Sequence, residues 1–400
     1  MSVDKNVPQI RFKGFSGEWE LNKLGQVYSF NYGVFNNNPS NGGQYPVYGA
    51  NGVIGGYTSF NAESSAVIGH MGEYAGSVLW AEGKHFVTYN GTIAKPKKSD
   101  FSPLFGYFKL VKMDLKKVCG GSGQPFLSYD ALERLDFIFP TEKEQTQIGN
   151  YFQKLDNLID QHQQKHDKLS SIKKAMLEKM FPKQGETVPE IRFKGFSGEW
   201  EVRPFGICFA NIPNNTLSRA DLNYEMGLAK NIHYGDVLIK FGEILDLRKE
   251  VLPFISSDVV ANKLKHAALQ NGDIIIADAA EDDTVGKCTE LFNIDEQFIL
   301  SGLHTIAVRP TLPFASKYLG YYLNSTSYHD QLLSLMQGTK VLSISKTAIQ
   351  NTNVIFPKRL EEQTKIGNYF QKLDTLINQH QQQITKLNNI KQACLSKMFV

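Results

Sequence analysis

Two segments of this chain occur twice, and the copies alternate along the sequence. The first segment, Val7–Glu20, returns as Val188–Glu201 with 13 of 14 residues identical. The second, Glu144–Phe181, returns as Glu362–Phe399 with 27 of 38 identical. A long insert separates the two segments in each half, and the two inserts barely resemble each other. A repeat of this length indicates that one structural unit was duplicated, so the repeated frame has one task and each insert has its own.

The repeat divides the 400 residues into two halves. We expect an α/β (α+β) fold with two similar globular domains. Two long repeated helices join these domains as an antiparallel coiled coil with pseudo-two-fold symmetry. The expected boundaries are 1–140 for the first domain, including segment 7–20; 141–182 for the first helix; 183–357 for the second domain, including segment 188–201; and 358–400 for the second helix.

Apolar or amphipathic residues recur in steps of four and three along both repeated helices, which is the spacing of a coiled-coil seam. The predicted seam contains Ile148, Phe152, Leu155, Ile159, His162, His166 and Leu169 in the first helix, and Ile366, Phe370, Leu373, Ile377, His380, Ile384 and Leu387 in the second. The alternative is that each helix covers its own globular domain. We interpret His162 and His380 as polar seam residues that set the register, not as metal ligands.

Both inserts contain short β-like runs separated by Gly, Pro and Asn. Predicted strands are 46–48, 66–68, 78–80, 86–88 and 92–94 in the first insert and 236–239, 273–277 and 304–308 in the second; predicted helices are 103–110 and 315–324. The inserts end alike, at Ser128–Pro140 and Ser345–Pro357. We therefore expect one fold with different surface loops.

Those loops carry side chains that can read DNA. Asn and Glu match the edges of adenine and cytosine, respectively, and Lys suits phosphates. The candidate DNA-binding residues are Tyr32, Asn36, Asn37, Asn38, Asn51, His70, Glu73 and Tyr74 in the first insert, and Asn214, Asn215, Lys230, Lys240, Lys263 and Lys265 in the second. The competing interpretation of each is an ordinary turn residue, because Asn and Gly are common in turns.

Signals for catalysis are scarce. The sequence has no P-loop, no Asn-Pro-Pro-aromatic motif for adenine methylation and no zinc-ligand spacing, so we expect neither a catalytic site nor a metal site. The Gly120–Gly123 cluster is interpreted as a turn. Asp278 and Glu281–Asp283, together with Lys287, imitate a nuclease metal site only in composition.

The overall composition points to an ordinary globular protein. The net charge is +3, and positive and negative side chains nearly balance in each insert. Any DNA binding must therefore depend on a local patch or on a partner. No membrane span or signal peptide is visible, and four scattered cysteines indicate free thiols in the cytoplasm.

Together these residues resemble the specificity (S) subunits of bacterial and archaeal type I restriction–modification systems. The resemblance covers essentially the whole chain. It depends on the interleaved repeat, on the I-R-F-K-G-F-x-G-E-W opening of each half, on the E-Q-x-x-I-G-x-Y-F-x-x-L-D helices, and on the segments Gly42–Gly52 and Gly302–Pro310.

The resemblance implies that each insert is a target recognition domain that reads one half of an asymmetric double-stranded DNA site through the major groove. The helices would set the spacer and dock two modification (M) subunits, through which restriction (R) subunits join. No cofactor is expected on this chain; S-adenosylmethionine belongs to M, and ATP and Mg to R. The chain itself would not be an enzyme, whereas the complex would methylate adenine N6 and cleave DNA with ATP. Two alternatives stay open: a coiled-coil scaffold that binds protein, and a DNA methyltransferase or nuclease half.

Overall fold

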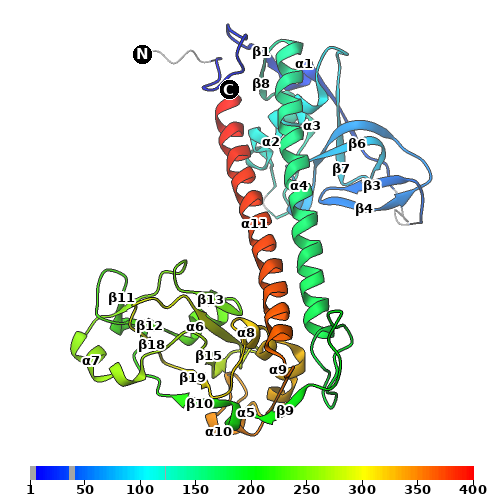
Figure 1. The fold of residues 1–400 in the computed structure, drawn as a ribbon. Coiled ribbons are helices and arrows are strands. Elements are labelled where there is room, and N and C mark those ends of the chain that lie inside the picture. The colour runs from blue at the N-terminus through cyan, green and yellow to red at the C-terminus, as the bar shows by residue number, and fades with distance from the viewer. Residues whose placement is uncertain (1–5, 36–40, 122) are drawn as a thin grey trace. The chain divides into compact units, whose positions relative to one another are not determined.

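The computed structural model describes residues 6–35, 41–121 and 123–400. The chain forms two compact units, Met1–Gln164 with His380–Val400, and Lys165–Gln379. Two long helices, α4 (Glu142–Lys179) and α11 (Leu360–Met398), each contribute residues to both units (Figure 1). In the described residues no helix is long and apolar enough to cross a membrane.

The first unit is built on a six-stranded sheet in the order β2-β7-β5-β6-β3-β4. Its strands are β2 (Tyr28–Tyr32), β3 (Tyr45–Gly49), β4 (Gly52–Tyr57), β5 (Ala62–Gly69), β6 (Val78–Val87) and β7 (Gly91–Pro96). All neighbours are antiparallel except β3 and β6, which are parallel. The predicted strands at 78–80 and 86–88 are therefore parts of one long strand, β6.

The second unit repeats five of these strands in the order β10-β19-β15-β17-β13. They are β10 (Phe209–Ile212), β13 (Ile244–Asp246), β15 (Ile274–Ala277), β17 (Cys288–Phe292) and β19 (Thr305–Pro310). Directions match strand for strand, because only β13 and β17 are parallel. A second sheet, β11 (Leu222–Asn223), β14 (Phe254–Ile255), β12 (Lys230–Ile232) and β18 (Ile299–Ser301), is added to this unit. One fold with different additions is thus confirmed.

Each insert is closed by a short antiparallel pair of strands. The pairs are β1 (Glu20–Lys23) with β8 (Asp136–Phe139), and β9 (Glu201–Pro204) with β21 (Asn353–Phe356). One-turn helices α1 (Leu24–Val27) and α5 (Phe205–Cys208) follow β1 and β9. Each insert therefore begins and ends side by side on the repeated frame.

Three of the short helices begin at a serine whose side chain caps the helix. Helix α2 (Pro103–Met113) has Ser102 as its N-cap, whose hydroxyl accepts from the Phe105 N–H, and proline at its first position. Helices α3 (Tyr129–Glu133) and α10 (Lys346–Gln350) are capped in the same way by Ser128 and Ser345. Helix α8 (Tyr318–Leu323) is equivalent to α2, and α9 (Thr326–Leu333) follows it.

The near-identical N-terminal segments clamp the start of each long helix. In the first unit, the Arg11 guanidinium binds both carboxylate oxygens of Glu144 at 2.7 Å and also donates to the Gly17 carbonyl. In the second unit, Arg192 does the same with Glu362 and Gly198. Both glutamate side chains are almost fully buried, so the bidentate pairing offsets their desolvation.

The neighbouring glutamines tie each long helix to its insert. Gln145 accepts from the Ser102 N–H and donates to the Pro140 carbonyl, and Gln363 makes the same two bonds with Ala315 and Pro357. The Glu-Gln pair is therefore repeated in sequence because it performs the same packing task twice.

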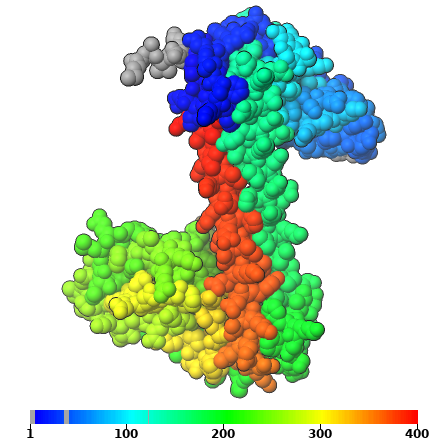
Figure 2. Space-filling model, turned by 45° about the horizontal axis from the view of Figure 1, so that its top comes forward, coloured from blue at the N-terminus to red at the C-terminus, as the bar shows by residue number. Residues whose placement is uncertain are grey.

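The C-terminal end of each long helix enters the core of a unit. Phe399, just after α11, lies 5.5 Å from Phe105 and 5.6 Å from Phe152 between ring centroids. Phe181, just after α4, lies 5.9 Å from Phe370 and 5.5 Å from Tyr322 in the same way. The N-terminal segment also lies against the end of α11, through a hydrogen bond from the Ile10 N–H to the Lys397 carbonyl (Figure 2).

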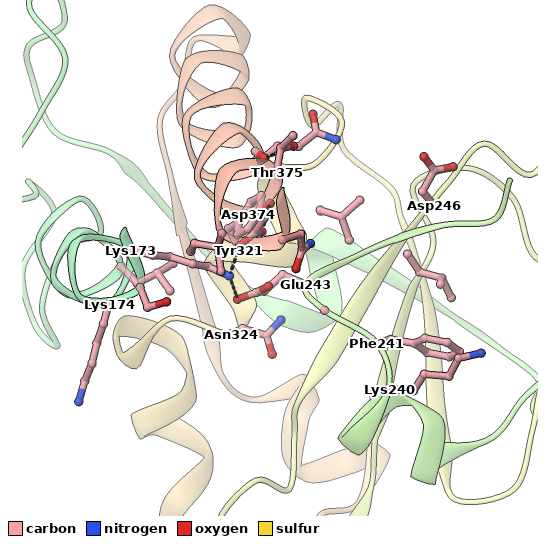
Figure 3. Close-up of a pocket in the computed structure, with 18 of the residues that line it drawn as sticks. Lys173, Lys174, Lys240, Phe241, Glu243, Asp246, Tyr321, Asn324, Asp374 and Thr375 are labelled. Carbon is pink, nitrogen blue, oxygen red and sulfur yellow. Dashed lines mark hydrogen bonds and ion pairs between the residues drawn. The ribbon is translucent and has the colours of Figure 1, made fainter. Parts of the chain in front are cut away.

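Within each unit, α4 and α11 run antiparallel. In the first unit the contacts are Tyr151 with Cys394 at 3.6 Å, Asp156 with Lys391 at 2.5 Å, and His162 Nδ1 with His380 Nδ1 at 2.8 Å. In the second unit, Lys173 bridges Asp374 at 2.6 Å and Glu243 at 2.7 Å, at the bottom of a groove of about 870 Å³ (Figure 3). Lys173–Asp374 and Lys391–Asp156 are the same ion pair in the two copies.

The seam residues serve two purposes. Ile148, Phe152, Leu155, Ile366, Phe370, Leu373 and Ile384 are buried, and Ile159, His162, His166, Leu169, Ile377, His380 and Leu387 are partly buried. Phe152 also packs on Phe108 of α2 at 5.0 Å between ring centroids. The two interpretations of the seam therefore both hold, because each helix pairs with the other and also covers its own domain.

One strand prediction was wrong. Residues 236–239 belong to helix α6 (Tyr234–Ile239), not to a strand. His233 caps this helix, because its ring Nδ1 accepts from the Gly235 N–H. Asp236 in the first turn complements the helix dipole. The cap and the dipole interaction both favour a helix, although the apolar run Val237–Ile239 fits a strand.

Candidate nucleic-acid interface

Loops from distant parts of the first insert meet where β5 ends and β7 begins. The His70 N–H donates to the Asn90 carbonyl, and the His70 carbonyl accepts from the Leu127 N–H. A backbone bridge joins Val34 to Thr88. The loops after β2, β5 and β6 and the segment before α3 are thereby held together by main-chain bonds.

A stack of aromatic rings occupies this meeting point. Tyr32 lies between Tyr129 and His70, with centroid distances of 4.1 and 4.4 Å. Phe126 meets the other side of His70 edge-on at 5.9 Å. Tyr32 and Phe126 are exposed, at 39% and 41%, whereas His70 is 6% exposed. His70 therefore positions the outer rings rather than presenting its own edge.

The surroundings of His70 disfavour its charged form. Burial lowers the pKa of His70, and the nearby Asn90 carbonyl opposes that shift only in part. Its Nδ1 and the Oδ1 of Asn90 are buried and make no well-formed hydrogen bond among the described residues. Unpaired buried polar atoms are costly, and Trp19, Tyr28, Trp80 and Thr92 in the same unit also carry one.

A hollow of about 340 Å³ lies beside the stack. Its lining includes Asn51, Glu73, Tyr74, Tyr89 and Gln124. Tyr74 and Tyr89 are 42% and 43% exposed. Ring faces and amide groups dominate, with one carboxylate and no Lys or Arg among the described lining residues, so this surface suits base edges better than phosphates.

The glycine cluster begins at a β-bridge that was not predicted as part of the site. Gly120 and Phe126 exchange two backbone hydrogen bonds of 2.9 Å, and Met71 pairs with Phe126. Gly121 has a φ of +101°, and a Cβ there would lie 2.4 Å from the Gln124 carbonyl oxygen. We call the described residues of Gly120–Phe126, which leave out residue 122, the first-domain hairpin; only their glycines signalled it.

The second unit holds an equivalent hairpin at Gln337–Ser343. These two residues exchange backbone hydrogen bonds of 2.9 and 2.8 Å, and Gly338 has a φ of +117°. β16 (Ala279–Ala280) pairs with β20 (Leu342–Ser343), as Met71 pairs with Phe126. The second-domain hairpin has one glycine, Gly338, and no glycine cluster, so it was not predicted from the sequence.

The surrounding main-chain bonds are also repeated in the second unit. The Asp278 N–H donates to the His304 carbonyl, and the Asp278 carbonyl accepts from the Ile344 N–H. Asp278 therefore stands where His70 stands, and His304 stands where Asn90 stands. Lys346 follows the capping Ser345 of α10, as Tyr129 follows Ser128 of α3.

The side chains at these second-domain positions are a carboxyl group, an imidazole and an amine. His304 Nδ1 lies 3.2 Å from Asp278 Oδ1, and Lys346 Nζ donates to Asn214 Oδ1 at 2.9 Å. Burial raises the pKa of the Asp278 carboxyl, while His304 and Lys346 act against that shift. The frame is thus shared, and its chemistry differs between the domains.

The predicted first-domain residues are mostly brought together. Asn51, Glu73 and Tyr74 line the hollow, and Tyr32 and His70 belong to the stack beside it. Asn36, Asn37 and Asn38 lie outside the described residues. Asn90, Phe126 and Tyr129 were not predicted, because each looks like an ordinary turn or helix residue in sequence.

The predicted second-domain residues are not brought together. The Asn214 side chain accepts a hydrogen bond from Lys346. Asn215, in contrast, is buried, and its amide donates to the Asn231 side chain and to the Ser301 carbonyl. Lys230 donates to Gln297, and Lys240 donates to the Val251 carbonyl and pairs with Glu250. Lys263 and Lys265 are exposed on and just after α7 (Asp258–Lys263).

No group of three or more His, Cys, Asp or Glu among the described residues could hold a metal ion. Asp282 instead bonds Thr284 in its own loop, with its carboxylate accepting from the backbone N–H and the hydroxyl. The acidic run after β15 is therefore a solvated turn.

Comparison with known proteins agrees with this architecture. Residues 16–171 and 230–389 match the family model of the type I restriction modification DNA specificity domain. The type I restriction enzyme MjaVIII specificity subunit of Methanocaldococcus jannaschii is 25% identical over 311 residues, covering 76% of this chain and 71% of that protein. A putative type I restriction enzyme MjaX specificity subunit from the same organism is 23% identical over 210 residues, covering 50% and 45%.

Solved structures show the same fold. The S subunit of a type I restriction–modification system from M. genitalium superposes with a TM-score of 0.63 at 15% identity, covering 98% of this chain and 99% of that one. A chain from a study of type I complex assembly and conformational transition superposes with a TM-score of 0.51 at 16% identity, covering 95% and 97%. Since the family model matches both halves, this chain belongs to the type I restriction modification DNA specificity domain family.

Proposed function

We propose that each domain of this chain reads one half of an asymmetric, two-part double-stranded DNA site, with an unread spacer between the halves. One observation carries the proposal: two domains that share a five-strand order hold different side chains on the same set of loop ends. A shared backbone frame with different loop side chains suits two DNA-reading domains, here called reading heads, that differ only in the bases they recognise.

The long helices set the spacer in this proposal and dock two M subunits, through which R subunits join. The exposed polar faces of α4 and α11 and the charged groove at Lys173 offer surface for this docking. S-adenosylmethionine would be bound by M, and ATP and Mg by R, so methylation of adenine N6 and DNA cleavage would need the whole complex. A chain that works on cellular DNA with these partners would act in the cytoplasm.

The test is to co-express the chain with its M subunit and map methylated adenines across a genome. We expect a motif of two unlike halves separated by a fixed unread gap, with one methylated adenine in each half on opposite strands. A continuous or palindromic motif would contradict the proposal. Methyl transfer by the purified chain without M would show that it is an enzyme in its own right.

A further inference from the structure

Three matched positions carry different chemistry in the two domains. They are the residue after the equivalent strands β5 and β15 (His70, Asp278), the residue before β7 and β19 (Asn90, His304), and the first residue of α3 and α10 (Tyr129, Lys346). Equivalent backbone hydrogen bonds fix the first two positions, and equivalent serine caps fix the third. The frame therefore places both sets of side chains in the same way.

We propose that these matched positions determine specificity, and that the second domain reads a G·C base pair through Asp278 and Lys346 while the first domain carries aromatic and amide groups at the same positions. The inference rests on the proposed function and assigns residues to it. The sequence marks Asp278 only as a candidate metal ligand. It marks neither His304 nor Lys346 as a candidate DNA contact.

The second-domain side chains match the edges of a G·C pair. A carboxylate accepts from the cytosine amino group, and a lysine donates to guanine O6 and N7. Asp278 supplies the first group and Lys346 the second. Their present partners, His304 and Asn214, are polar side chains, so protein hydrogen bonds can be exchanged for DNA hydrogen bonds on binding.

Exposure supports this assignment. The Asp278 side chain is 25% exposed and that of His304 is 52% exposed, so both can be reached from solvent. Lys346 is also partly exposed. Asn215, in contrast, is 7% exposed with its amide already bonded.

The first domain offers neutral groups at the same positions. Tyr32 is held between His70 and Tyr129, and Asn90 lines the neighbouring hollow. Rings contact the thymine methyl group. His70 is a positioning residue here, because its ring is buried between Tyr32 and Phe126.

The experiment measures binding and motif choice by the full chain assembled with M, using a randomised DNA pool. The variants are Asp278→Asn and Lys346→Met, and the control is Asp283→Asn, which removes a charge at an exposed site in the following loop. Each test variant should weaken binding to the wild-type motif about ten-fold, as expected for one lost base contact. Each should relax or change a single G·C position in the second half-site and leave the first half unchanged. Asp283→Asn should leave the motif as it is.

Several results would overturn the inference. One is a second half-site without G·C pairs. Another is an unchanged motif with both variants, and a third is a change in the first half-site. If Asp278→Asn melts below the wild type by more than the control does, Lys346→Met alone decides the question on the same criteria. A wild-type complex that selects no two-part motif at all would instead refute the proposed function.

Discussion

At the scale of single residues, the strands and their main-chain bonds decide which loop side chains meet. Asn51, Glu73 and Tyr74 come from two glycine-rich loops and line one hollow. Asn215 has the same residue type as Asn51 but is turned inward to bond Asn231. Asp278 and His304 lie 26 residues apart and meet only through backbone pairing of β15 with β19. Such meetings depend on strand register, which composition does not reveal.

A buried histidine makes the first domain sensitive to acid. His85 is 0% exposed, its Nδ1 lies 2.8 Å from the Gly83 carbonyl, and its Nε2 lies 3.0 Å from the Ser65 hydroxyl. One neutral tautomer satisfies both, with Nδ1–H donating and Nε2 accepting. Burial lowers the pKa of His85 below its ordinary 6.5. The unfolded chain therefore takes up a proton that the folded chain does not, so this stabilisation is present above about pH 6.5 and is lost as the pH falls through the folded pKa.

Thermal melting of wild type and His85→Gln between pH 8 and pH 5 checks this. At pH 8 we expect the variant to be less stable by about 1–3 kcal/mol, the cost of an unsatisfied buried partner. The difference should shrink toward pH 5. A difference that stays constant across this range would show that His85 does not titrate with unfolding.

At the scale of elements, the heptad spacing predicted the long helices well, but not what they touch. The seam also serves the globular cores, since Phe152 packs on Phe108 as well as near Phe399. Periodicity reports one apolar face and cannot say which partner covers it. The error at 236–239 has a similar origin, because a short apolar run fits a strand or a helix until its cap is recognised.

Glycines in the long helices mark where α2 and α8 approach closely. A Cβ on Gly149 would lie 2.8 Å from the Phe105 backbone nitrogen, whereas one on Gly367 would lie 3.2 Å from the Lys317 carbonyl carbon. Alanine favours a helix by about 1 kcal/mol over glycine, but overpacking costs about 1–3 kcal/mol. We expect Gly149→Ala to lower the free energy of unfolding, and Gly367→Ala to lower it less or not at all. Denaturant titration of both variants measures this, and the reverse order would contradict the close approach at Gly149.

At the scale of the whole molecule, the sequence repeat predicted the duplication of the structural unit. Near-identity of Val7–Glu20 and Val188–Glu201 reflects one clamp used twice, Arg11 on Glu144 and Arg192 on Glu362. The shared strand order of the inserts was visible only as a similar ending, because sheet topology survives after most side chains have changed. The hairpin at Gln337–Ser343 has a single glycine, Gly338, which is too weak a signal to predict it.

The proposed spacer role can be tested by lengthening both helices together. Helices that run antiparallel keep their register only if matched insertions are made, so we would add seven residues after Gln163 in α4 and after Gln381 in α11. Seven residues add about 10.5 Å and nearly two full turns, which corresponds to about three base pairs of B-DNA. Methylated-motif mapping should show both half-sites unchanged and a longer gap. An unchanged gap with both half-sites intact would mean that the helices do not set it.

The central claim is that each insert reads its own half-site from an equivalent place on a duplicated frame. The most direct measurement replaces residues 202–357 with a second copy of residues 21–140 and maps the motif methylated by the chain with M. Two identical reading heads on a duplicated frame should methylate an inverted repeat of the first half-site, with the second half-site gone. If the original asymmetric motif persists, the second insert does not read DNA, and the claim of two equivalent reading heads is wrong.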